Sequence, residues 1–251
     1  MLHGTDTLSY TASALSFMLE NLGKTVIITG SQIPIFETRT DGTDNFTGAL
    51  IIAANYVIPE VCVLFGNKLM RGNRTIKYSC DALEAFKSPN CPPLGSIGVN
   101  IEIDYRQIFR PCSVSAFTVH SNLDPNVGIL RLFPSMSISS FKAFLAPPIK
   151  GVVMQSFGSG NIPSNRQDIL DELQAASDRG VIIVNCTQCV GGAVAGIYST
   201  GEVLNRVGVI SGCDMTPEAA LTKLSYVLAK TEWTLKEKKQ VSLSFFKLYI
   251  I

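Results

Sequence analysis

The chain has only two histidines, His3 and His120, among its 251 residues. A Ser-His-Asp triad needs a histidine beside its nucleophile, and a two-histidine metal site would need both residues together. Two histidines are too few to support either kind of site, so we expect neither a triad nor a bound metal. His3 is instead predicted to be structural, holding a turn by a hydrogen bond.

Neither sign of charge dominates the sequence. Lys and Arg number 21 against 20 Asp and Glu, and the formal net charge is +1. The basic residues are scattered, so nothing favours nucleic acid or an acidic membrane as a partner. This balance favours a small neutral or zwitterionic substrate. A hydrophobic content of 46% with 16% charged residues indicates a packed globular protein.

The sequence also lacks the run of roughly 20 apolar residues that spans a bilayer. Its most apolar stretch, VSLSFFKLYII at residues 241–251, is shorter and is predicted to form a buried or aggregation-prone strand. No basic segment followed by an apolar core opens the chain, and seven cysteines make an odd number. We therefore expect no secreted disulfide framework and a cytoplasmic location.

Strand and helix patterns alternate along the chain, which predicts α/β domains with parallel sheets covered on both faces. Residues 122–126 (NLDPN) are the best linker, so an N-terminal domain at 1–121 and a C-terminal domain at 127–251 are expected. The strands are predicted at 25–29, 61–65, 99–103, 116–120, 127–133, 150–154 and 181–185. The helices are predicted from Asp44-Asn45 through Ala54, at 139–145 and 164–179, and from the cap Thr216 to Leu228.

The run HGTDT at residues 3–7 comes just before an amphipathic helix with Leu8, Ala12, Leu15, Leu19 and Leu22 at helical spacing and Gly23 as its stop. Thr5 and Asp6 therefore stand where a strand hands over to a helix, at the sheet edge where ligands bind. Only Met1 and Leu2 precede His3, so the strand that should feed this junction is missing. Taken alone, Thr5 and Asp6 are better explained as helix caps, and Lys77 as a solvated surface lysine.

Six motifs in order closely resemble the L-asparaginase family over residues 1–235. The resemblance is to the cytosolic type I branch and its animal members, which are also described as 60 kDa lysophospholipases. It implies two α/β domains of the asparaginase type, hydrolysis of L-asparagine to L-aspartate and ammonia without a cofactor, and a homo-oligomer. The motifs are HGTDT (3–7), VIITGSQIP (26–34), RGNRTIK (71–77), VVMQSFGSGN (152–161), VNCTQC (184–189) and GVISGCDMT (208–216).

The resemblance implies a catalytic group of Thr5, Asp6 and Lys77. A lysine keeps its proton to about pH 10.4 unless it is desolvated or lies near another cation. Lys77 is then expected to take a proton from Thr5 or from a water that Thr5 positions. Asp6 is expected to orient Lys77 and to bind the substrate's α-ammonium group. The backbone near Ser31 is expected to meet the substrate's side-chain amide.

Thr187 and Cys189 match a region that resembles the effector site of the type I bacterial enzymes. The arginine of that site is replaced here by Gln155, and the loss of a bidentate carboxylate clamp should weaken amino-acid capture. Cys186 and Cys189 have the spacing of a redox pair or a zinc half-site. No second such pair exists and the flanking strand is apolar, so two buried thiols are predicted.

The chain departs from the family pattern at its front. It has no TGGTI-type run bearing the principal nucleophilic threonine and no DSS-type run that grips the substrate carboxylate. The sequence is therefore expected to be N-terminally truncated, with impaired activity on its own. Two alternatives stay open: a catalytically incompetent amino-acid-binding or hetero-oligomer subunit, and a lysophospholipase.

Overall fold

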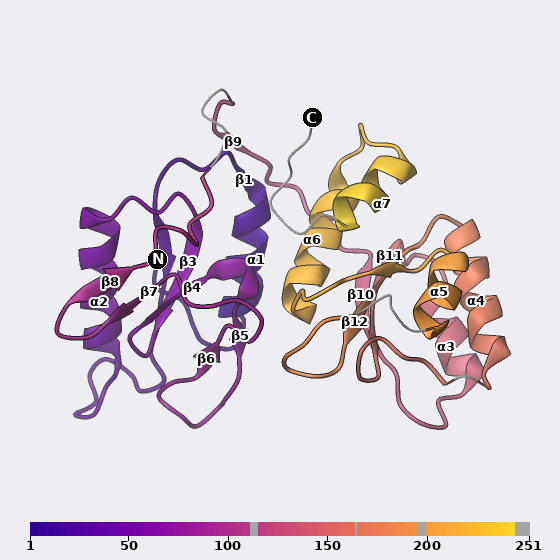
Figure 1. Cartoon of the computed structure of the whole chain (residues 1–251), viewed down its shortest axis with the longest axis horizontal. Coiled ribbons are helices and arrows are strands. Elements are labelled where there is room, and N and C mark those ends of the chain that lie inside the picture. The colour runs from indigo at the N-terminus through magenta and orange to yellow at the C-terminus, as the bar shows by residue number, and fades with distance from the viewer. Residues whose placement is uncertain (111–114, 164, 195–198, 244–251) are drawn as a thin grey trace. The chain divides into compact units, whose positions relative to one another are not determined.

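A computed structural model of the chain describes residues 1–110, 115–163, 165–194 and 199–243. The chain divides into two compact units, Met1–Ser121 and Asn122–Ile251. Each unit has a sheet between helices, and Figure 1 shows the first in indigo to magenta and the second toward yellow. The α/β class expected from the sequence is confirmed. Within the described ranges, no helix combines the length and the apolar character needed to cross a membrane.

The first unit is built on a five-stranded sheet in the order β2-β3-β4-β7-β8. Only β2 and β3 are parallel, and the remaining neighbours pair antiparallel, so this sheet is mixed and not purely parallel. Its elements are α1 (Leu8–Met18), β1 (Leu19–Glu20), β2 (Val26–Ile28), α2 (Gly42–Asn55), β3 (Val61–Phe65), β4 (Lys68–Arg71), the 3₁₀ helix η1 (Gly72–Arg74), β5 (Ile76–Lys77), β6 (Phe86–Lys87), β7 (Gly95–Ile97), β8 (Ile101–Ile103) and β9 (Thr118–Val119).

Strand β3 explains why helices lie on both faces of this sheet. All five of its residues are buried, as expected for a strand covered on both sides. Val61, Val63 and Phe65 pack with residues of α1, whereas Cys62 and Leu64 pack with residues of α2. Alternate side chains of a strand point to opposite faces, so α1 and α2 flank the sheet, as Figure 1 shows.

The first three residues of the chain run parallel to β2. They lie where a strand leading into Thr5 was expected to be missing. A single parallel bridge joins Leu2 to Thr29. The amide of Thr29 donates to Met1 O (3.0 Å), and the amide of His3 donates to Thr29 O (2.9 Å). These bonds deliver the chain to Thr5 at the end of β2.

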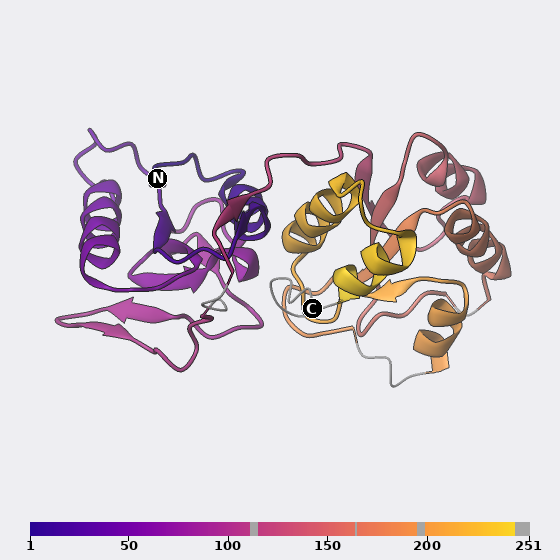
Figure 2. The ribbon, with the colours of Figure 1, turned by 90° about the horizontal axis from the view of Figure 1, so that it is seen from above.

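The second unit has a four-stranded parallel sheet in the order β10-β11-β12-β13. Helices α3 and α4 pack on one face of β11 through Val152 and Met154, and α6 packs on the other through Val153. Figure 2 shows the two helical layers on either side of the strands. The elements are β10 (Val127–Arg131), α3 (Ile138–Leu145), β11 (Gly151–Ser156), α4 (Gln167–Asp178), β12 (Ile182–Thr187), α5 (Ser199–Arg206), β13 (Ile210–Ser211), α6 (Pro217–Ala229) and α7 (Leu235–Leu243).

Several expected helix and strand limits differ from the structure, and three of the differences lie in α1, α2 and α7. Helix α1 ends at Met18 and not at Gly23, because Leu19 and Glu20 pair with β9. Helix α2 begins at Gly42, so the predicted cap at Asp44-Asn45 is wrong. The strand predicted at 241–251 is also wrong where it can be checked, because Val241–Leu243 form the end of α7, and 244–251 lie outside the described residues.

Candidate active site

Thr5, Asp6 and Lys77 meet in the first unit. The Lys77 amine donates to Thr5 Oγ1 at 2.8 Å and to Asp6 Oδ1 at 2.7 Å. The Lys77 side chain is 22% exposed, whereas that of Asp6 is 92% exposed. A hydroxyl, an amine and a carboxylate thus converge at the end of β2, with the carboxylate open to an incoming ligand.

Neither Thr5 nor Asp6 caps helix α1. The N-cap residue is Thr7, and its side chain makes no capping hydrogen bond. His3 holds the turn that presents Thr5: its ring contacts Gly4 O through Nδ1 (2.7 Å) and Thr11 Oγ1 through Nε2 (2.9 Å). The capping explanation therefore fails for Thr5 and Asp6, and His3 has the structural role expected of it.

Lys77 reaches Thr5 because the chain before it is packed tightly under α1. Helix η1 lies between β3 and α1, where a Cβ on Gly72 would come within 2.8 Å of Val61 O and 3.2 Å of Ala12 O. Both atoms belong to the backbone, so a larger residue would force η1 away from α1. The interpretation of Lys77 as a solvated surface lysine is wrong, because this packing carries it to Thr5.

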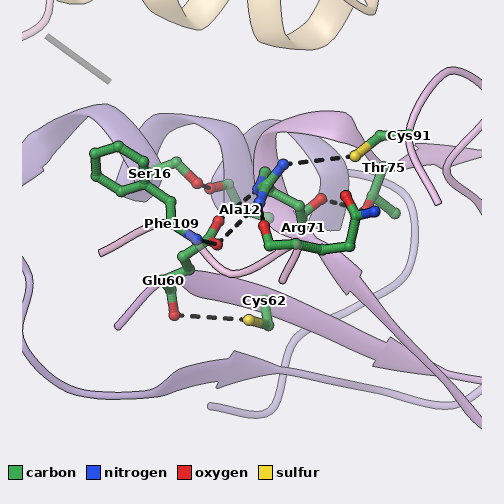
Figure 3. A network of polar contacts seen from close by, with 9 residues as sticks. Ala12, Ser16, Glu60, Cys62, Arg71, Thr75, Cys91 and Phe109 are labelled. Atoms are coloured by element: carbon green, nitrogen blue, oxygen red, sulfur yellow. Dashed lines mark hydrogen bonds and ion pairs between the residues drawn. The ribbon is translucent and has the colours of Figure 1, made fainter. Parts of the chain in front are cut away.

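A buried ion pair anchors the start of the same segment, as Figure 3 shows. Arg71 Nε and Nη2 donate to the Glu60 carboxylate at 2.5 and 3.0 Å, and the Phe109 amide donates to the same carboxylate at 2.6 Å. Glu60 is 5% exposed and Arg71 is 9% exposed. The Thr75 hydroxyl donates to Arg71 O (2.8 Å), so this network fixes the chain two residues before Lys77.

The Lys77–Asp6 contact also lowers the pKa of the Asp6 carboxyl. The hydrogen bond from Lys77 is the largest influence on Asp6, its positive charge is the second, and together they hold the pKa of the Asp6 carboxyl below its ordinary value. Asp6 is therefore ionised at neutral pH. As an ammonium, Lys77 is a donor to both Thr5 and Asp6.

Ser31 lies in the loop that follows β2, close to this group. A Cβ on Gly30 would clash with His3 O and lie 4.0 Å from Thr5 Cγ2, which places Gly30 directly beside the HGTDT turn. Ser31 packs against Gly42 at the start of α2, where a Cβ on Gly42 would lie 3.2 Å from Ser31 Cβ. The loop of Ser31 thus passes between the Thr5 turn and the beginning of α2.

The proposed effector residues Thr187 and Cys189 lie in the second unit after β12. The Thr187 hydroxyl donates to Gly158 O (2.5 Å) and accepts from the Cys189 amide (3.0 Å). Cys186 is buried but Cys189 is exposed, so the prediction of two buried thiols is wrong for Cys189, which lies past the end of the strand. Among the described side chains, no group of three or more His, Cys, Asp or Glu is arranged to hold a metal.

Three residues around the Ser31 loop were not singled out from the sequence as functional: Gln32, Asp41 and Asn45. Their side chains bond to the backbone of this loop or of the hairpin that carries Lys77. Asn45 was predicted only as part of a helix cap, Gln32 was given no role of its own within the motif at 26–34, and Asp41 belongs to no motif that indicates a function. Only the tertiary structure brings Asp41 and Asn45 beside the loop of Ser31.

Comparisons with known proteins place the chain in a family. Residues 1–109 match the family model described as "Asparaginase, N-terminal", and residues 126–241 match the "Glutaminase/Asparaginase C-terminal domain". The chain is 60% identical over 239 residues to an L-asparaginase of Dirofilaria immitis, covering 95% of this chain and 40% of that protein. It is 49% identical over 241 residues to the mouse 60 kDa lysophospholipase, covering 96% of this chain and 43% of that protein.

A solved structure is also similar. The crystal structure of L-asparaginase I from Vibrio cholerae O1 biovar eltor str. N16961 aligns with a TM-score of 0.89 at 45% identity. The alignment covers 98% of this chain and 73% of that one. The chain spans less than half the length of the two curated relatives that it matches. The two family models and the asparaginase structure together lead to one conclusion: this chain belongs to the asparaginase family.

Proposed function

We propose that this chain is an asparaginase-family amidohydrolase that converts L-asparagine and water to L-aspartate and ammonia, with Thr5, Asp6 and Lys77 as its retained catalytic group and with a rate lowered by the absence of the TGGTI-type threonine. The observation that carries the proposal is the pair of short contacts from the Lys77 amine to Thr5 Oγ1 and Asp6 Oδ1. A hydroxyl beside an amine, with a carboxylate orienting the amine, is the pattern of an activated nucleophile and its base.

Lys77 must lose a proton before it can act as a base. In this proposal the α-ammonium of asparagine binds the exposed Asp6 carboxylate and thereby places a second cation beside Lys77. A neighbouring like charge disfavours the ammonium form, so substrate binding itself favours the neutral amine. Lys77 then takes the proton of Thr5, or of a water held by Thr5, while the backbone near Ser31 meets the side-chain amide.

The proposal predicts that the purified full chain releases ammonia from L-asparagine. Replacing Thr5 by Ala removes the hydroxyl that Lys77 contacts, and we expect the rate to fall by about 100-fold or more. Thr7→Ala is the matched control, because Thr7 is an exposed threonine two residues away whose side chain caps nothing. Equal rates for the Thr5→Ala and Thr7→Ala variants would contradict the assignment of Thr5.

The same assay separates this proposal from a non-enzymatic one. An amino-acid-binding subunit without turnover would bind asparagine in a calorimeter but release no ammonia. Effector binding at Thr187 and Cys189, a homo-oligomeric state and a cytoplasmic location remain proposals of the same kind. For the oligomer, light scattering of the purified chain is the direct measurement.

A second candidate activity is hydrolysis of lysophospholipids. It is favoured by the mouse relative, whose name is 60 kDa lysophospholipase and which shares 49% identity over 241 residues. If the chain has this activity, fatty acid should be released from a lysophospholipid, and Thr5→Ala should abolish the release. Release that survives Thr5→Ala would exclude the Thr5 group as its site.

A further inference from the structure

The loop that carries Ser31 is held by hydrogen bonds to one carboxylate, that of Asp41. Asp41 accepts hydrogen bonds from the Gln32 amide, at 3.0 Å to Oδ1 and 3.1 Å to Oδ2, and from the Ile33 amide at 3.0 Å. These two amides immediately follow Ser31. Because hydrogen bonds to a charged acceptor are about twice as strong as neutral ones, Asp41 holds this loop more firmly than a backbone contact would.

The Asp41 carboxylate binds the loop of Ser31 and does not cap helix α2. It stands at the N-cap position of α2, where an aspartate normally accepts hydrogen bonds from the first turn of its own helix. Its side chain makes no such bond. The Gly42 amide donates instead to Thr40 Oγ1 (2.9 Å), and the Thr40 hydroxyl donates to Ile33 O (2.9 Å). The carboxylate at the helix start thus serves the loop and not the helix.

Asn45, one turn into α2, extends the same network. Its Nδ2 donates to Gly30 O (3.0 Å) and to Asp41 Oδ2 (3.1 Å), and its Oδ1 accepts from the Gly66 amide (3.2 Å). Asn45 is 5% exposed. Because Gly30 follows β2 and Gly66 follows β3, Asn45 ties together the ends of the two parallel strands beside the Thr5 turn.

The Gln32 side chain connects this loop to the hairpin that bears Lys77. Its Nε2 donates to Cys80 O (3.1 Å) and Ala82 O (3.2 Å). These carbonyls lie between β5, which contains Lys77, and β6. A continuous chain of hydrogen bonds therefore runs from Asp41 through Gln32 to the Lys77 hairpin.

We propose that Asp41 is a positioning residue of this site: it fixes the loop of Ser31 for the substrate's amide and, through Gln32, the hairpin that presents Lys77. The inference rests on the proposed function for the identity of the substrate, but the positioning itself is testable without turnover. Without Asp41, the loop occupies its binding-competent form for only a fraction of the time, and the apparent affinity falls by that fraction.

The test compares Asp41→Asn with Asp44→Asn in the full chain. The two substitutions remove the same charge from the start of the same helix, but Asp44 is an exposed residue of the first turn. An asparagine at position 41 has one acceptor oxygen and turns an NH₂ group toward amides that need acceptors. Hydrogen exchange followed by mass spectrometry then reads the amides of residues 31–33 and 78–85 directly.

We expect Asp41→Asn to speed exchange at residues 31–33 by about tenfold or more and to speed it less at 78–85, while α1 and β3 keep wild-type protection. Asp44→Asn should match wild type in all four regions. Unchanged exchange at 31–33 in Asp41→Asn would overturn the inference. Faster exchange throughout the first unit would also overturn it, because that result indicates general destabilisation and not positioning.

Steady-state kinetics supply a second, independent reading. We expect KM for asparagine to rise about tenfold in Asp41→Asn with kcat within about threefold of wild type, because saturating substrate orders the loop. A lower kcat with an unchanged KM would mean lost active protein and would count against the inference. If wild type itself releases no ammonia, the proposed function fails, whereas the exchange result still decides the role of Asp41.

Should Asp41→Asn fail to fold, Gln32→Glu tests the second link alone. It keeps the size of the side chain but removes the donor to Cys80 O and Ala82 O. The expected result is faster exchange confined to residues 78–85, with 31–33 protected as in wild type. Unchanged exchange at 78–85 would show that Gln32 does not hold the hairpin.

Discussion

The Asp6 carboxylate makes a short contact with the Lys77 amine and is nevertheless exposed to solvent. Its contact with the Lys77 amine is 2.7 Å, yet its side chain is 92% exposed. Most ion pairs with one exposed member add little to stability, because water screens them. The contact is therefore better understood as a device that orients Lys77 and sets the charge of Asp6 than as a source of stability.

The first prediction concerns the titration of Asp6. Because Lys77 lowers its pKa, Asp6 should titrate below the ordinary carboxyl range in wild type and move up toward that range in Lys77→Met. The stabilising contribution of the pair is present above that ordinary value and is lost as pH falls through the lowered one. The measurement is an NMR titration of the side-chain carboxyl carbon.

Asp104 is the internal control in that titration. Its pKa is also lowered, chiefly by the hydrogen bond from Arg106, so the Lys77→Met substitution should leave it unchanged. An Asp6 midpoint that is the same in wild type and Lys77→Met would mean that the two groups do not interact in solution.

Sequence reasoning located Thr5, Asp6 and Lys77 through their motifs, because each motif is short and keeps its order along the chain. It did not find Asp41, because the helix was predicted to begin at Asp44-Asn45 and no motif includes Asp41. It likewise expected Cys189 to be buried with Cys186, although the strand ends at Thr187. Side-chain direction at the end of an element depends on tertiary contacts that local pattern does not encode.

At the scale of elements, the Glu60–Arg71 pair joins the start of β3 to the end of β4 and holds the chain that leads to Lys77. Burial acts to lower the pKa of Arg71, but the hydrogen bonds and the charge of Glu60 outweigh it, and the pKa stays above its ordinary value. Arg71 is therefore charged in the core, and its guanidinium depends on the contact with the Glu60 carboxylate.

The second prediction follows from that dependence. Arg71→Met leaves the Glu60 carboxylate buried without its cation, which should cost about 3–5 kcal/mol in the free energy of unfolding. The double variant Arg71→Met with Glu60→Gln should cost less, because the neutral amide oxygen still accepts from the Phe109 amide. Denaturant unfolding of the full chain measures both.

Arg106→Met provides the matched control, since Arg106 is 90% exposed in its pair with Asp104. That substitution should change the free energy of unfolding by less than about 1 kcal/mol. If the double variant is as unstable as Arg71→Met alone, the cost does not come from the uncompensated charge, and this account of the pair is wrong.

The longer and more deeply buried helices and strands were predicted better from the sequence than the short ones. Strand β3 is confirmed at Val61–Phe65. It was predictable because five consecutive apolar residues between turns are typical of a buried strand. Helix α6 is confirmed with its cap, where Thr216 Oγ1 accepts from the Ala219 amide at 3.2 Å. Strands β4 and β7 were missed, because Lys68–Arg71 and Gly95–Ile97 are short and gain their structure from neighbouring strands.

At the scale of the whole molecule, each of the two units contains one buried and one exposed cysteine that can be compared. Cys62 and Cys186 are buried, Cys80 and Cys189 are exposed, and none of these four described residues forms a disulfide. Burial is the largest cause that raises the pKa of Cys186 to about 12, with Cys213 and Glu218 adding to it. A thiol reacts through its thiolate, so Cys186 should be inert at neutral pH.

The third prediction is a labelling pattern. A maleimide at pH 7 should modify Cys80 and Cys189 readily and spare Cys62 and Cys186, as mapped by peptide mass spectrometry. In denaturant all four should react, which controls for intrinsic differences between the peptides. Labelling of Cys186 as fast as Cys189 in the folded protein would contradict the described second unit.

The most direct test of the account as a whole is the rate of ammonia release from saturating L-asparagine by wild type, Lys77→Met and Lys87→Met. Lys87 lies on β6, paired with Ile76 across the hairpin, and its ammonium sits over the Tyr78 ring at 3.5 Å. We predict release by wild type, a kcat at least about 100-fold lower in Lys77→Met, and near wild-type release in Lys87→Met. No release by wild type, or equal release by the two lysine variants, would contradict the claim that Thr5, Asp6 and Lys77 act together on an amide.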